Sequence, residues 1–123
     1  MIQPTEGEHV RRCTPEMRGW YDLLRSEVLH FGTDVHLHTT KSYIVFQRKG
    51  RNFAYFNIRP TLNQIVIDIA HPHRYGQEVP FAPDLLSEHP GQRKGRALRI
   101  RVDSADDAER ARPLLEQSYH FGR

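Results

Sequence analysis

The sequence predicts an α+β domain in two layers, with an antiparallel sheet of about five strands and the N- and C-terminal helices on one face. Three observations support this. The segment 41–70 holds three short runs rich in Ile, Val, Tyr and Phe, separated by two turn-forming stretches. Another alternating run lies at 97–102, and apolar residues recur at helical spacing in 14–31 and 104–119. β-branched and aromatic runs bounded by Gly, Pro and Asn are typical of strands joined as hairpins.

The size of the chain predicts one domain with one core, since it has 123 residues. No apolar run approaches the roughly 18 residues that a membrane span needs. The N-terminus lacks the apolar stretch of a signal peptide, so we expect a cytoplasmic protein with no membrane partner. Cys13 is the only cysteine, which excludes an internal disulfide.

Charge is distributed unevenly along the chain. Residues 41–101 carry eleven Lys and Arg against four Asp and Glu, a net charge of +7, within a whole-chain charge of +3. The remaining residues carry seven against eleven, a net charge of −4. A basic middle between acidic ends indicates a polyanionic partner. The alternative is an ordinary solvated surface.

The N-terminal part divides into two segments. Residues 1–13 show no periodicity and are predicted to be a flexible arm, so that 14–123 form the single domain. Thr14 suits a helix N-cap and Pro15 the first helical position. The apolar face of this helix would be Met17, Trp20, Tyr21, Leu24, Val28 and Phe31. Gly32 is the expected stop.

Alternation predicts which side chains each strand turns inward. A short strand is expected over Val35 to Thr40, with two histidines on its outer side. In the middle run of 41–70, Ala54, Phe56 and Ile58 oppose Phe53, Tyr55, Asn57 and Arg59. In its last run, Ile65, Ile67 and Ile69 oppose Val66, Asp68 and Ala70. With both helices on one face, the other face would be bare and would carry His36, His38, Tyr43, Tyr55, Arg59, Arg99 and Arg101.

A long loop is predicted at 71–96, where four prolines and three glycines interrupt the pattern. Within it, residues 83–86 could form one helical turn. Ser104 is expected to cap the last helix, whose inner face would hold Ala108, Ala111, Leu115 and Tyr119. Pro113 predicts a kink or break in that helix near 109–112.

Short motifs in this order resemble a small bacterial family of unknown function, over residues 17–121. They are Thr40-Lys41-Ser42-Tyr43-Ile44-Val45-Phe46, then Asn52-Phe53-Ala54, and finally Gln117-Ser118-Tyr119. Members of that family, once catalogued as predicted transport proteins, occur alone and fused C-terminally to GmrSD-type restriction enzymes, which cut modified DNA. The sequence departs from the family pattern at Pro113 and in a longer 71–96 loop. The resemblance implies no catalytic residue, and by association it favours a role near nucleic acid.

A nucleic-acid-binding surface is the leading candidate site. Tyr43 and Tyr55, with Phe53, would form a platform on which bases stack. The cations that would neutralise phosphates are Lys41, Arg48, Lys49, Arg51, Arg59, Arg93, Lys94, Arg96, Arg99 and Arg101. The consensus of RNA-recognition domains does not occur. The alternative is that the aromatic residues belong to the core or to a homodimer interface.

Other chemistries find little support in the sequence. The pairs His36/His38 and His71/His73 could offer imidazole ligands, but no cysteine pair or helical His-Glu-x-x-His accompanies them. A metal-dependent nuclease needs clustered carboxylates, and Asp68 is the only acid on a predicted sheet strand. No nucleophile elbow or phosphate-binding glycine loop occurs either. We therefore expect no enzyme, no metal and no cofactor.

The sequence thus favours a non-enzymatic binding domain, an accessory module for DNA or RNA that uses a basic sheet face and the hairpin tips. The first alternative is a protein-interaction or homodimerisation domain that uses the same face. The second is a small-molecule pocket beneath the 71–96 loop.

Overall fold

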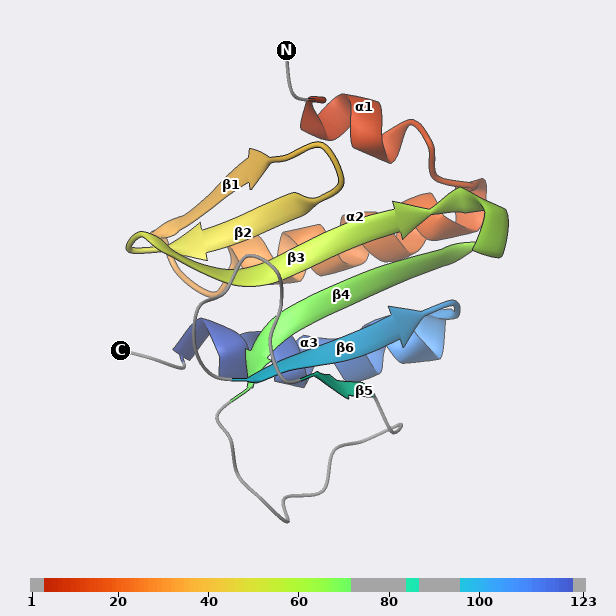
Figure 1. Ribbon diagram of the computed structural model, residues 1–123. Coiled ribbons are helices and arrows are strands. Elements are labelled where there is room, and N and C mark those ends of the chain that lie inside the picture. The colour runs from red at the N-terminus through yellow and green to blue at the C-terminus, as the bar shows by residue number, and fades with distance from the viewer. Residues whose placement is uncertain (1–3, 72–83, 87–95, 121–123) are drawn as a thin grey trace.

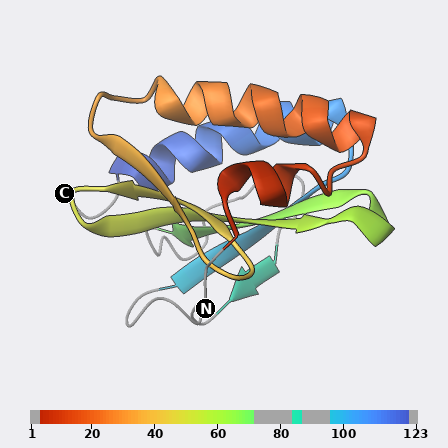
Figure 2. The same ribbon diagram turned by 90° about the horizontal axis from the view of Figure 1, so that it is seen from above.

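The computed structural model describes residues 4–71, 84–86 and 96–120. Figures 1 and 2 show two layers, one formed by the sheet and the other by the two long helices. The elements in chain order are α1 (Glu6–Val10), α2 (Pro15–Leu29), β1 (Val35–Thr39), β2 (Ile44–Arg48), β3 (Arg51–Arg59), the 3₁₀ turn η1 (Pro60–Leu62), β4 (Gln64–His71), β5 (Asp84–Leu86), β6 (Arg96–Val102) and α3 (Ala105–His120). This arrangement confirms the predicted α+β class, with both long helices on one face of an antiparallel sheet.

The sheet has the strand order β1-β2-β3-β4-β6-β5. The added strand β5 lies where the sequence suggested a helical turn, so that prediction is wrong for Asp84–Leu86. β5 pairs antiparallel with β6, with Leu85 opposite Leu98. Without β5, the backbone N–H and C=O groups on one side of β6 would have no strand to pair with. A helical turn uses its own backbone groups internally and could not have bonded them.

The core lies between the sheet and the helices, and the predicted alternation supplies it. Phe56 of β3 is its centre, with ring centroids 6.0 Å from Tyr21 on α2 and 5.1 Å from Phe46 on β2. The three isoleucines of β4 and the inner face of α3 complete it. At about 25 cal/mol per Å² of apolar area buried, this cluster is the main source of stability.

Helix α2 starts as predicted and ends earlier than predicted. The Thr14 hydroxyl accepts the N–H of Met17 at 3.2 Å, and Pro15 occupies the first helical position. The helix ends at Leu29 with His30 as its C-cap, so Gly32 does not stop it. A Cβ at Gly32 would instead overlap the hydroxyl of Tyr119, and the glycine allows that close approach.

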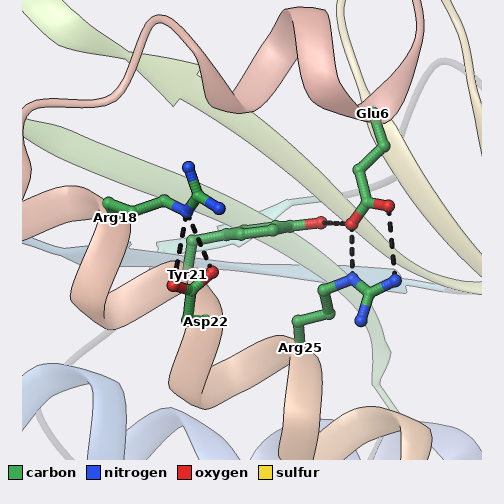
Figure 3. A network of polar contacts seen from close by, with 5 residues as sticks. All are labelled: Glu6, Arg18, Tyr21, Asp22 and Arg25. Carbon is green, nitrogen blue, oxygen red and sulfur yellow. Dashed lines mark hydrogen bonds and ion pairs between the residues drawn. The ribbon is translucent and has the colours of Figure 1, made fainter.

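Helix α1 corrects the prediction of a flexible arm, because Glu6–Val10 are helical and packed. Thr5 and Glu8 form a capping box, in which each side chain bonds the backbone N–H of the other residue. The Glu6 carboxylate accepts from the Tyr21 hydroxyl at 2.5 Å (Figure 3). His9 is 2% exposed and lies 2.9 Å from the carbonyl oxygen of Thr40. Helix α1 is thus held against both α2 and the residue that follows β1.

The β2–β3 hairpin explains why one predicted face assignment is wrong. Lys49 and Gly50 both have positive φ, at 52° and 79°, as a two-residue type I′ turn requires. The register then shifts, because Phe46 pairs with Ala54 while the next residue of β2 pairs with Asn52. Phe53 is the extra residue of this β-bulge, so it turns into the core instead of sharing the face of Tyr55.

Pro113 predicts a kink or a break; helix α3 continues through this residue, so the break does not occur. Ser104 caps it as expected, accepting the N–H of Asp107 at 3.1 Å. Pro113 is exposed, while Ala111 and Leu115 on either side of it are fully buried. Packing on both sides therefore holds the helix together where one backbone hydrogen bond is missing.

Candidate functional site

The face of the sheet opposite the helices carries the side chains that alternate with the core. In β2 to β6 they are Val45, Gln47, Asn52, Tyr55, Asn57, Arg59, Val66, Asp68, Arg99 and Arg101. Figure 1 shows the sheet from this side, with α2 and α3 behind it.

The centre of this face is buried, which corrects the expectation of a bare platform. Val45, Tyr55, Val66 and Asp68 are each at most 4% exposed, although none belongs to the core cluster beneath the helices. The Tyr55 ring lies 5.7 Å from that of Tyr43, edge to face, and its hydroxyl accepts from Asn52 at 3.1 Å. Tyr55 therefore offers neither a stacking surface for a base nor a contact for a second copy of the chain.

Arg99 lies in this buried centre and has a partner there. Its Nε and Nη2 donate to the two carboxylate oxygens of Asp68 at 2.8 and 2.9 Å, and Asp68 is 1% exposed. Such a two-point pair holds both groups in one geometry. Arg99 thus compensates a buried acid, and Asp68 is tied to an arginine rather than to other carboxylates.

Two more of the predicted cations turn toward the helices. Arg48 lies 4.2 Å from the ring centroid of Tyr119 and donates to Asp34 at 2.9 Å and to the Tyr119 carbonyl at 3.0 Å. Arg51 donates to the carbonyls of Ser118 and Tyr119 at 3.0 and 3.1 Å. Both therefore bind the C-terminal end of α3, where the helix dipole favours cations.

The pKa shifts in this cluster agree with these contacts. Hydrogen bonds from Tyr119 and then Arg48 hold the pKa of Asp34 below its ordinary value of 3.8. Burial, and then the charge of Arg48, lower the pKa of Arg51. Lys49 at the hairpin tip is exposed, whereas Arg48 and Arg51 are half-buried.

The other described cations of the predicted site lie near the point where β3 ends and β4 begins, a region we call the Arg59 end of the sheet. Arg101 of β6 pairs with Val66 of β4, which pairs in turn with Asn57 of β3. Arg59 follows two residues later on the same face, and its Nε donates to the Asn57 amide oxygen at 2.8 Å. Arg101 is exposed and Arg59 half-buried.

The turn between β1 and β2 brings Lys41 to the same end. The Asn57 amide donates to the carbonyl of Ser42 at 2.8 Å, which fixes this turn against β3. Lys41 is exposed in the turn, and Tyr43 is half-buried with its ring against Tyr55. Cations from three separate segments, Lys41, Arg59 and Arg101, thus lie at the same end of the sheet.

Part of the predicted site lies beyond the described residues. Arg93 and Lys94 fall outside them, as does the pocket expected beneath the 71–96 loop; Arg96 opens β6, and only its backbone is described. His36 and His38 are exposed on β1. Over residues 4–71, 84–86 and 96–120 there is no group of three or more His, Cys, Asp or Glu arranged to hold a metal ion. In the same ranges no helix is long and apolar enough to cross a membrane.

The fold and the Arg59 end define a small α+β domain that presents polar and cationic side chains at one end of an antiparallel sheet. The family model described as a domain of unknown function (DUF5655) matches residues 7–122, and the chain belongs to this family. Searches of curated proteins and of solved structures found no match.

Proposed function

We propose that this chain is a non-enzymatic binding domain that engages the phosphate backbone of nucleic acid through the Arg59 end. The observation that supports this is that Lys41, Arg59 and Arg101, from three segments far apart in the sequence, lie at the same end of the sheet as the half-buried Tyr43. Phosphate contacts by arginine and lysine supply affinity without sequence specificity.

The contact surface in this proposal is smaller than the one predicted from sequence. Tyr43 is the one aromatic residue of the predicted platform that is not fully buried, so stacking adds a single base at most. Arg48, Arg51 and Arg99 act in folding, through the carbonyls at the end of α3 and through Asp68. Three phosphate contacts make a weak module, which fits an accessory role.

The family context adds support by association. The chain resembles bacterial domains that occur fused to GmrSD-type restriction enzymes, and such a fusion would bring the domain close to an enzyme that cuts DNA. A domain with a few phosphate contacts would hold its partner enzyme near the substrate, because tethering raises the effective concentration of the second contact. An accessory role beside a DNA-cutting enzyme would require the protein to be in the cytoplasm, where the DNA is.

Fluorescence anisotropy with labelled single-stranded and duplex DNA of random sequence tests the proposal. We expect Lys41→Gln, Arg59→Gln and Arg101→Gln each to weaken binding uniformly across sequences. Arg110→Gln, on the exposed side of α3, is the matched control and leaves binding unchanged. Equal losses in all four variants would indicate nonspecific attraction to net charge and would reject the Arg59 end as the site.

A variant that removes a negative charge should have the opposite effect on binding and gives a second test. Asp103 lies just beyond β6, two residues after Arg101, and hydrogen bonding to Asp107 raises its pKa. Removing its negative charge with Asp103→Asn should strengthen binding, because like charges repel phosphate. Weaker binding by Asp103→Asn would contradict a purely electrostatic contact at this end.

A further inference from the structure

A groove of about 390 Å³ lies between α1 and α2. Its charged lining consists of Arg11, Arg18 and Arg25 with Glu6 and Asp22, and Tyr21 forms its floor. This volume is at the lower end of the 300–1,000 Å³ range, roughly, that small-molecule sites occupy.

Two of the three arginines are matched by acids. Arg25 Nε donates to Glu6 Oε2 at 2.5 Å, and the Tyr21 hydroxyl donates to the same oxygen at 2.5 Å. Burial alone would raise the pKa of Glu6, but the hydrogen bonds from Arg25 and Tyr21 outweigh it and keep the pKa below 4.5. Glu6 is therefore ionised at neutral pH, and its charge cancels that of Arg25.

The second pair leaves donors free. Arg18 uses Nε to bind the two Asp22 oxygens, at 3.1 and 3.3 Å. Figure 3 shows its two terminal nitrogens turned away from Asp22, on the side of α1. These are the groups with which arginine forks bind carboxylate or phosphate.

The third arginine, Arg11, lowers the pKa of its neighbour Glu8 through its charge, after the larger effect of the hydrogen bond from the Thr5 backbone, but no acid of the lining is left to pair with it. Among the described residues, the exposed guanidinium of Arg11 makes no hydrogen bond or ion pair. With Arg18 and Arg25 matched by Asp22 and Glu6, the lining keeps a net charge of +1. A groove whose lining carries a net charge of +1 and unused guanidinium donors is complementary to an anion.

We propose that this groove binds a small organic anion through its carboxylate or phosphate group, held by Arg11 and the terminal nitrogens of Arg18. Tyr21 and Val10 also line the groove but are only 1% and 7% exposed, so the anionic group would supply most of the contact. None of its lining residues belongs to the Arg59 end, and the proposal does not depend on nucleic-acid binding.

Titration of the full chain with inorganic phosphate and with benzoate, at constant ionic strength in sodium chloride, tests this site by ¹⁵N NMR. We expect saturable shifts in the millimolar range for the Arg18 Nε–H and the amides of residues 6–25. Arg11→Gln and Arg18→Gln should each weaken binding about tenfold, the loss of roughly 1.4 kcal/mol. Asp22→Asn should tighten it, because the lining then gains positive charge.

The outcomes separate cleanly. Arg110→Gln on α3 is the control and should bind both anions as the wild type does. Absence of saturable shifts with both probes, or equal affinity in Arg11→Gln and wild type, would overturn the proposal. If Arg18→Gln unfolds the chain, the affinity of Asp22→Asn for the two anions still tests the proposal. Weaker binding by Asp22→Asn than by the wild type would contradict an anion site.

Discussion

Replacing Arg51 by alanine separates a folding role from a binding role at the β2–β3 hairpin. Its Nη2 donates to two carbonyls in the last turn of α3, those of Ser118 and Tyr119, at 3.0 and 3.1 Å. Those carbonyls have no helical donor of their own, since the last turn of a helix leaves its oxygens unpaired. Arg51→Ala therefore loosens the end of α3 from the sheet.

The size of the effect follows from these contacts. Hydrogen bonds that involve a charged group contribute about 1.5–3 kcal/mol each, and a cation at a helix C-terminus adds about 0.3–1 kcal/mol. Against this, Arg51 Nη1 is buried without a hydrogen-bond partner, which costs roughly 1–3 kcal/mol in the wild type. We expect a net loss of about 2 kcal/mol, or roughly 6–12 °C in Tm for a domain of this size.

Urea unfolding followed by far-UV circular dichroism measures this loss. A single domain of this length is expected to unfold in one step, so midpoints convert to free energies. Lys49→Gln is the matched control, because Lys49 is exposed at the tip of the same hairpin and should change stability by less than about 0.5 kcal/mol. If Arg51→Ala is as stable as Lys49→Gln, Arg51 does not hold α3 and the assignment is wrong.

Three further substitutions test other parts of the fold. Glu6→Gln should cost about 1–2 kcal/mol at pH 7 by urea unfolding. That difference should vanish in acid: the folded pKa of Glu6 lies below its ordinary 4.5, so the wild type loses this stability as pH falls through the folded pKa. Gly32→Ala should lower Tm, at a cost of about 1–3 kcal/mol, because its Cβ would overlap the Tyr119 hydroxyl; an unchanged Tm would contradict the close approach. Pro113→Ala should raise stability by about 1–2 kcal/mol, because the helix regains a hydrogen bond; a loss would mean that the proline is needed.

The fold could be predicted because its evidence is local in the sequence. The alternation of Ile65, Ile67 and Ile69 places β4 on the core without knowledge of its neighbours. The caps at Thr14 and Ser104 depend on residues three positions away. The structure confirms these predictions, because each depends on residues only a few positions apart.

The site was harder to predict because its contacts are distant in the sequence. Arg51 is separated from its partner carbonyl at Ser118 by 67 residues, and nothing near the hairpin indicates that contact. The direction of Phe53 depends on a bulge that arises from the pairing of two strands. A count of cations along the chain could not tell which of them serve the fold.

Helix α1 was missed although its capping box is visible in the sequence. Thr5 and Glu8 have the required spacing, but a helix of five residues is too short to be stable alone. Contacts of Glu6 with α2 and of His9 with Thr40 supply the missing stability. The arginines of the adjoining groove went unnoticed for the same reason, since the groove exists only once α1 is packed.

The most direct test of the proposed function is the dependence of DNA affinity on salt. If Lys41, Arg59 and Arg101 neutralise three phosphates, log K should fall against log of the salt concentration with a slope of about −2 to −3, because each contact contributes roughly −0.7 to −0.9. The triple variant with all three changed to glutamine should show a slope near zero. Wild-type protein that does not bind DNA even at low salt, or that keeps its slope in the triple variant, would contradict the account.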